Sequence, residues 1–319
     1  MADILAITGP IYIVIAIGYL STRFGMFARA DMRVFGKFVI QLALPALLFN
    51  ALSQRSVAEV LNPVYLTAYT AGSLLVAALG IAWARLVARK SLSGSAIVAM
   101  GMTCSNSGFI GYPLALQLLG PTAGVALALC MIVENVLMLP LLLALSDLDQ
   151  NGAPAPGRWR RAVAQSFRGL LRNPMIIAIV AGLVFALLGL RLPEPAARVL
   201  GLFATSCGAL ALFVIGGTLV GLQVRGLRRD VAVIAIGKLL LHPLAVLLFL
   251  LVLPPLEPAL RTAALVMAAV PMLGIYSILA QKSGNDDMAA AAQIGTTVAS
   301  FVTLTALLWA LRHSAGWGL

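Results

Sequence analysis

The sequence contains very little charge for its length. Only 10% of its 319 residues are Asp, Glu, Lys or Arg, whereas soluble domains contain about 25%. Hydrophobic residues make up 61% of the chain, and its mean hydropathy is +1.01. One soluble core cannot bury this much apolar material, because the same composition would have to cover the surface as well. The composition therefore excludes a soluble globular domain and predicts an all-α integral membrane protein with the lipid bilayer as its solvent.

Residues that carry enzyme or metal chemistry are also scarce. The three cysteines (Cys104, Cys130 and Cys207) lie inside apolar runs without Cys-x-x-Cys spacing, and the two histidines are far apart. Cysteines in such runs usually pack as small hydrophobic residues. The chain also lacks a Gly-x-Ser-x-Gly elbow and a phosphate-binding Gly-Lys-Ser/Thr loop. We predict no enzyme activity, no metal and no cofactor; coupling to H+ or Na+ is left open.

The formal net charge of +11 would favour nucleic-acid binding if the basic residues formed a continuous surface. They instead lie in short clusters between apolar runs, as in loops that face an anionic inner leaflet. Examples are Arg23, Arg29 and Arg33, then Arg85, Arg89 and Lys90. The pattern predicts a plasma-membrane (inner-membrane) protein with no nucleic-acid partner.

Ten apolar runs are long enough to cross the hydrocarbon, which takes roughly 20 residues of helix. The first run has no basic leader and exceeds the length of a signal-peptide core, so we interpret it as a retained helix. The predicted spans are 4–22, 34–53, 64–84, 95–118, 121–145, 174–190, 197–221, 231–253, 260–281 and 288–311.

Loop charges predict the orientation of these spans. The loops after the odd-numbered spans carry 15 Lys and Arg residues, and those after the even-numbered spans, with the C-terminal tail, carry 5. Lys37 and Lys238 lie within spans. The positive-inside rule then places both termini outside. It also makes the longest loop, 146–173, cytoplasmic.

The same loop divides the chain into two similar halves, 1–145 and 174–319. Proline, glycine and apolar positions recur at offsets of 164 to 166 residues, as with Pro10 and Gly18 against Pro174 and Gly182. Five spans per half is an odd number, so the second half enters the membrane from the opposite side. We therefore predict two inverted five-helix repeats, a plan common among secondary transporters.

Spans 4 and 9 are interrupted at equivalent places. Gly111 and Pro113 interrupt span 4, and Pro271 and Gly274 interrupt span 9. Proline removes a helix hydrogen bond and clashes with the preceding turn. Unwound backbone persists in a membrane only where protein covers it or it lines a cavity. The matched breaks favour a site whose half-helix N-termini attract an anion; two ordinary proline kinks are the alternative.

Polar residues within the spans complete the candidate site, since each is costly in a bilayer. We interpret Asn106, Asn135, Asn50 and the break-side Tyr276 as substrate-binding residues, together with the glycines and prolines of the breaks. A second set consists of Glu134, Lys238 and His242. These three form either an internal ion pair, a proton-coupling group or a buried structural contact, and Lys238 alternatively extends to a membrane face.

The motifs resemble those of the auxin efflux carrier family, in its bacterial form. The stretch from Asn106 to Leu114 resembles the fourth-helix crossover of that family, and the stretch from Leu44 to Phe49 resembles its second-helix motif. Lys238-Leu239 with His242-Pro243, and Pro271 with Ala280-Gln281 and Gly284, resemble the eighth- and ninth-helix patterns.

The resemblance implies ten helices, of which 1, 2, 6 and 7 form a scaffold and 3–5 with 8–10 form a mobile transport unit. It implies that broken helices 4 and 9 cross at the substrate site, and that Asn106 and Asn135 match the crossover and fifth-helix asparagines. It also implies a homodimer formed through the scaffold. The short central loop departs from the long loop of the plant carriers, so auxin and plant-type regulation do not carry over.

We therefore expect a secondary transporter that moves small organic anions, such as malonate, malate or auxin-like weak acids, by an elevator-type mechanism. A membrane sensor or interaction module that keeps the carrier fold without moving substrate is the alternative from another class. A passive channel is disfavoured because the spans lack a continuous polar lining.

Overall fold

The computed structural model describes residues 2–54, 61–150, 171–221, 228–281 and 283–314. Six of its helices are long and apolar enough to cross a membrane, and four shorter apolar helices accompany them. Most of the central loop, including its Gly-Pro stretch and four of its five arginines, lies outside the described residues. The structure is therefore that of an all-helical, multi-pass membrane protein.

The helices of the first half begin with α1 and follow the apolar runs of the sequence. Their bounds are α1 Ala2–Arg23, α2 Arg29–Phe38, α3 Leu44–Ser53, α5 Pro63–Leu86, α6 Leu92–Thr103, α7 Tyr112–Leu119, α8 Thr122–Ile132 and α9 Leu139–Gln150. The second half contains α11 Pro174–Leu188, α12 Glu194–Leu219, α13 Arg228–Ile236, α14 His242–Val252, α15 Pro258–Ala269, α16 Tyr276–Gln281 and α17 Asp286–His313.

Proline explains the four π-helical segments in the described residues. These segments are η1 Val39–Ala43, η2 Ser107–Gly111, η3 Val133–Met138 and η4 Gly237–Leu241. Each ends one residue before the X-Pro pair that opens the next α-helix, at Pro45, Pro113, Pro140 and Pro243. Because proline lacks an N–H and clashes with the carbonyl one turn earlier, the preceding turn widens instead of continuing as a regular α-helix.

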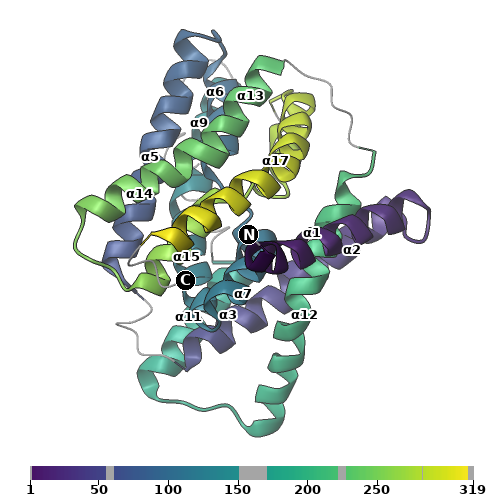
Figure 1. Cartoon of the computed structure of the whole chain (residues 1–319), viewed down its shortest axis with the longest axis vertical. Helices are drawn as coiled ribbons and strands as arrows, with labels where there is room; N and C mark the ends of the chain where they lie inside the picture. Colours follow the sequence, from purple (N-terminus) through teal and green to yellow (C-terminus); the bar gives the residue numbers. More distant parts are fainter. Residues whose placement is uncertain (1, 55–60, 151–170, 222–227, 282, 315–319) are drawn as a thin grey trace.

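The helices form two groups. Helices α1, α2, α3, α11 and α12 pack mainly on one another and occupy the lower and right-hand part of Figure 1. Helices α5, α6, α9, α13, α14 and α17 occupy its upper part. In the first group α1 crosses α12 closely because Gly216 of α12 has no side chain: a Cβ there would collide with the carbonyl oxygen of Ile15. Small residues allow this close backbone approach in membranes.

Candidate functional site

The two helix breaks lie against each other at the middle of the fold. Residues 104–106 follow α6, and residues 270–275 follow α15. The Asn106 N–H donates to the Pro271 carbonyl at 2.8 Å, and the Leu273 N–H donates to the Cys104 carbonyl at 3.1 Å. Together they make an isolated antiparallel bridge. Each break thus satisfies backbone groups that the other leaves free, which a bilayer requires of any non-helical segment.

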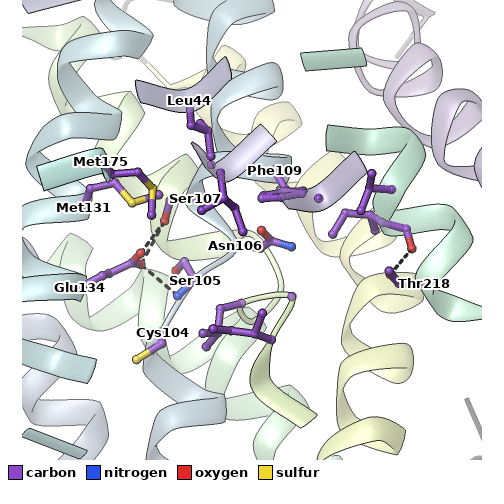
Figure 2. Close-up of a pocket in the computed structure, with 18 of the residues that line it drawn as sticks. Leu44, Cys104, Ser105, Asn106, Ser107, Phe109, Met131, Glu134, Met175 and Thr218 are labelled. Atoms are coloured by element: carbon purple, nitrogen blue, oxygen red, sulfur yellow. Dashed lines mark hydrogen bonds between the residues drawn. The ribbon is translucent and has the colours of Figure 1, made fainter. Parts of the chain in front are cut away.

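A cavity of about 470 Å³ opens beside this crossing. Its walls come from the breaks, from η1, η2 and η3, and from α2 and α12. Apolar side chains such as Leu44, Phe109 and Met175 form much of the lining (Figure 2). The polar lining residues are Arg33, Lys37, Gln41, Ser105, Asn106, Ser107, Glu134, Asn135 and Thr218. An apolar wall with a few polar groups is the usual form of a small-molecule site.

Asn106 is the polar side chain that the cavity leaves without a partner. Only 6% of the residue is exposed, and its carboxamide forms no hydrogen bond with any other described residue. In Figure 2 it points away from the group formed by Glu134, Ser105 and Ser107. A buried amide without a partner is costly. It is therefore positioned to bind a ligand in the cavity.

Glu134 is held in the opposite manner, by several donors at once. Its Oε1 accepts from the Ser105 N–H at 2.9 Å, from the Ser107 hydroxyl at 3.0 Å and from the Tyr69 hydroxyl at 3.2 Å. Ser107 also lies 3.0 Å from Oε2. Each of these partners can donate, which suits a carboxylate. Although Glu134 lines the cavity, its oxygens are thus already engaged by protein.

Lys238 lies behind the crossing and is completely buried. Its Nζ donates to the Ser105 hydroxyl at 2.7 Å and to the Ala268 carbonyl at 2.6 Å, and it lies 3.0 Å from His242 Nδ1. The side chain therefore does not extend to a membrane face. Ser105 connects Lys238 to Glu134, with its hydroxyl toward the ammonium group and its N–H toward the carboxylate.

His242 extends this network away from the cavity. Its Nε2 lies 2.9 Å from the Ser73 hydroxyl on α5. When Lys238 donates to Nδ1, the neutral ring carries its proton on Nε2 and donates it to Ser73. A single chain of buried hydrogen bonds then runs from Ser73 through His242, Lys238 and Ser105 to Glu134.

Four of the predicted site residues line the cavity: Asn106, Asn135, Gly274 and Glu134. Asn135 is tied to its own helix, where its Nδ2 donates to the Met131 carbonyl at 3.0 Å. The Gly274 carbonyl accepts from Gln293 Nε2 at 2.9 Å. Their roles in binding stay predictions.

The remaining predicted residues lie away from the cavity wall. They are Asn50, Gly111, Pro113, Pro271, Tyr276, Lys238 and His242. Tyr276 is fully buried and donates to the Ile97 carbonyl at 2.9 Å. Asn50 lines two other cavities, of about 500 and 610 Å³. Pro271 contributes its carbonyl to the bridge. These positions shape the crossing rather than face the cavity.

Several residues of this region escaped the sequence analysis. Ser105, Ser107 and Tyr69 organise Glu134, but small hydroxyl residues are common in apolar helices and give no distinct signal. Arg33 and Lys37 read as ordinary basic residues near a helix end. Their spacing of four residues was the available signal, since it places both on one face of α2. Among the described residues, no group of three His, Cys, Asp or Glu side chains is placed to hold a metal ion.

Apolar helices with a cavity at the crossing of two interrupted segments define a multi-pass membrane protein of the transporter class. The chain belongs to the auxin efflux carrier family, because the family model described as "Membrane transport protein" matches residues 6–310. The resemblance seen in the motifs is thereby confirmed.

Two kinds of curated relatives support this assignment. The chain is 27% identical over 316 residues to a Rhizobium meliloti (strain 1021) protein named "Putative malonate transporter", covering 99% of this chain and 98% of that protein. It is 24% identical over 243 residues to "Uncharacterized transporter YfdV" of Escherichia coli (strain K12), covering 75% and 76%. Family and relatives thus point to transport rather than catalysis.

Proposed function

We propose that this protein is a secondary transporter of small organic anions and that the cavity at the crossing is its substrate site. The observation that carries the proposal is Asn106, a buried amide without a protein partner that faces this cavity. Mono- and dicarboxylates fit its polar groups. Malonate is the first candidate because it appears in the name of the Rhizobium relative.

The helix that begins beside Asn106 adds a second attraction for anions. The first-turn N–H groups of Ser107, Gly108 and Phe109 have no partner within their own helix, and all three residues line the cavity. The helix continues to Leu119, so its dipole places partial positive charge at this end. A carboxylate at the crossing receives hydrogen bonds from the amide and from this turn.

The arrangement of the helices supports the ten-span inverted repeat. In this proposal α6, η2 and α7 form the fourth span, and α15 and α16 form the ninth. The α1–α12 contact then corresponds to the contact between α11 and α3, because the repeat exchanges spans 1 with 6 and 2 with 7. A two-fold pseudosymmetry accounts for both pairs.

An elevator-type movement fits the two groups of helices. The scaffold comprises spans 1, 2, 6 and 7, and the transport unit comprises spans 3–5 and 8–10. Their contact surface includes small residues: a Cβ at Gly124 of α8 would collide with Ala51 of α3. Smooth contact surfaces of this kind favour sliding. Coupling to H+ or Na+, a homodimer through the scaffold, and the plasma-membrane orientation with both termini outside stay predictions.

Uptake of labelled malonate and propionate into proteoliposomes tests the proposal. We expect saturable transport by the wild type, and at least a tenfold loss of apparent affinity in Asn106→Ala, since a hydrogen bond to a charged group contributes about 1.5–3 kcal/mol. Thr205→Ala is the control, because its exposed hydroxyl bonds only within α12. Unchanged uptake in Asn106→Ala contradicts the site. Binding without uptake by the wild type favours the sensor alternative.

A further inference from the structure

One wall of the cavity carries a row of polar side chains that the proposed site does not use. Arg33 and Lys37 of α2 and Gln41 of η1 follow one another at intervals of four residues, and all three line the cavity. Residues four apart lie on the same face of a helix, one turn above the other. With a rise of 1.5 Å per residue, the row extends for about 12 Å along the wall.

Neither cation of this row is neutralised by the described protein. The ion pairs found in the described residues are Lys90–Asp230 and Glu194–Arg198. Asp31, on the same helix, turns back to accept from the Ala28 N–H at 2.8 Å. Arg33 and Lys37 form no hydrogen bond or ion pair within the described residues.

The carboxylate of Glu134 does not serve as their partner either. It is the only acidic residue that lines the cavity, and the buried network already supplies donors to its oxygens and connects it to the Lys238 ammonium group. With Glu134 and Lys238 balancing each other, the described cavity retains two positive charges, on Arg33 and Lys37. An empty site of this charge is matched by a ligand that carries two negative charges.

We propose that Arg33 and Lys37 are the specificity-determining residues for dicarboxylates, which they recognise through the second carboxylate. This inference rests on the proposed function, in which the crossing binds the first carboxylate through Asn106 and the first turn of the η2–α7 helix. The second carboxylate then extends toward α2, where Lys37 and Arg33 neutralise it. Gln41 lies one turn further along the row and supplies a neutral donor.

Electrostatics explains why the row discriminates between substrates. A monocarboxylate satisfies the crossing but leaves both cations facing an apolar wall, so it gains little from them. A dicarboxylate gains two charge-assisted contacts where solvent screening is reduced. Since Arg33 and Lys37 are exposed at one end of the cavity, each contributes less than a buried charge does. We expect the pair to provide a preference of about tenfold to a hundredfold, not more.

The test compares malonate with propionate, which has a single carboxylate, in proteoliposomes at neutral pH. The double variant Arg33→Gln/Lys37→Met should reduce the malonate-to-propionate ratio of apparent affinities at least tenfold while propionate uptake changes less than threefold. Lys37→Arg should keep the preference. Arg29→Gln is the matched control, because it removes a positive charge from α2 at a residue that does not line the cavity.

Three results would overturn the inference. An unchanged ratio in the double variant shows that the second carboxylate is recognised elsewhere. Equal losses for both substrates, matched by Arg29→Gln, show a general attraction of anions instead of recognition. In either case carboxylate transport itself survives. If the wild type moves neither substrate, the proposed function fails first and the inference fails with it.

Discussion

At the scale of single residues, Ser105 determines how the buried charges meet. Its hydroxyl receives a hydrogen bond from Lys238, while its N–H binds Glu134, so it separates the two charges and satisfies both. Neither charge reaches solvent: Glu134 is 4% exposed and Lys238 is fully buried. Buried charges are tolerated in this way only when each has partners. The network therefore contributes to stability as a unit.

Removing one charge of this network should destabilise the protein more than removing both. We expect Glu134→Gln and Lys238→Met each to lower the free energy of unfolding by about 3 kcal/mol, because each leaves the opposite charge buried without balance. The double variant should lose less than the sum of the two, which thermal unfolding in detergent measures.

Glu194→Gln is the control for that comparison. Glu194 pairs with Arg198 on the surface of α12, where both side chains are about three-quarters exposed. Such pairs contribute little, so the melting temperature should hardly change. Additive losses in the Glu134 and Lys238 variants would show that the two charges do not act together.

Sequence reasoning identifies the residues of this network better than their arrangement. Glu134, Lys238 and His242 stand out because ionisable groups are rare in apolar spans. Their partners, Ser105 and Tyr69, are more than 100 residues away from Lys238 and give no pattern of their own. Which side chain bridges which charge is decided by packing between the two halves.

At the scale of elements, the prolines place the polar residues. Each π-helical segment widens the helix just before an X-Pro pair, and three of the four segments, η1, η2 and η3, line the cavity. The fourth carries Lys238. Single-turn π segments often occur at functional sites because they shift the following residues out of the α-helical register. The proline positions in the sequence thus fix where this shift occurs.

Regularising one of these segments should disturb the site. In Pro140→Ala we expect η3 to relax toward a regular α-helix, which moves Glu134 and Asn135 out of register with the cavity and weakens malonate binding at least tenfold. Pro258→Ala is the matched control, because Pro258 opens α15, where the first turn lacks helical N–H bonds in any case. Isothermal titration of both variants distinguishes them. Equal affinity in Pro140→Ala and the control would contradict the role of η3.

The interruptions themselves were predictable, but the π geometry was not. Glycine and proline within Gly111–Pro113 and Pro271–Gly274 predict that regular helix fails there, and α6 and α15 do end before these stretches. The widened turns leave no trace in hydrophobic periodicity, because membrane helices are apolar on every face and lack a strong moment. Backbone pairing between the two breaks likewise depends on how the halves meet.

At the scale of the whole molecule, the loop charges predict which ends face the cytoplasm. The three cysteines are buried, so the wild type offers little background to a membrane-impermeant thiol reagent. We expect the reagent to label Ser314→Cys on intact cells, and Ala88→Cys only after the membrane is opened. Ala88 follows α5 and lies beside basic residues, whereas Ser314 follows α17. The opposite pattern would reverse the predicted orientation.

The burial of Lys238 also has a consequence for how the protein is made. The helix from Arg229 to Val252 is apolar enough to enter the membrane although it carries this charge, which costs about 2.5–3.5 kcal/mol at its centre. Synthesis runs from the N-terminus, so Glu134 waits in the membrane for its partner until the eighth predicted span leaves the ribosome. The chain therefore passes through a stage in which its first half is inserted but incomplete. Quality-control proteases that detect unpaired intramembrane charges have that interval in which to act.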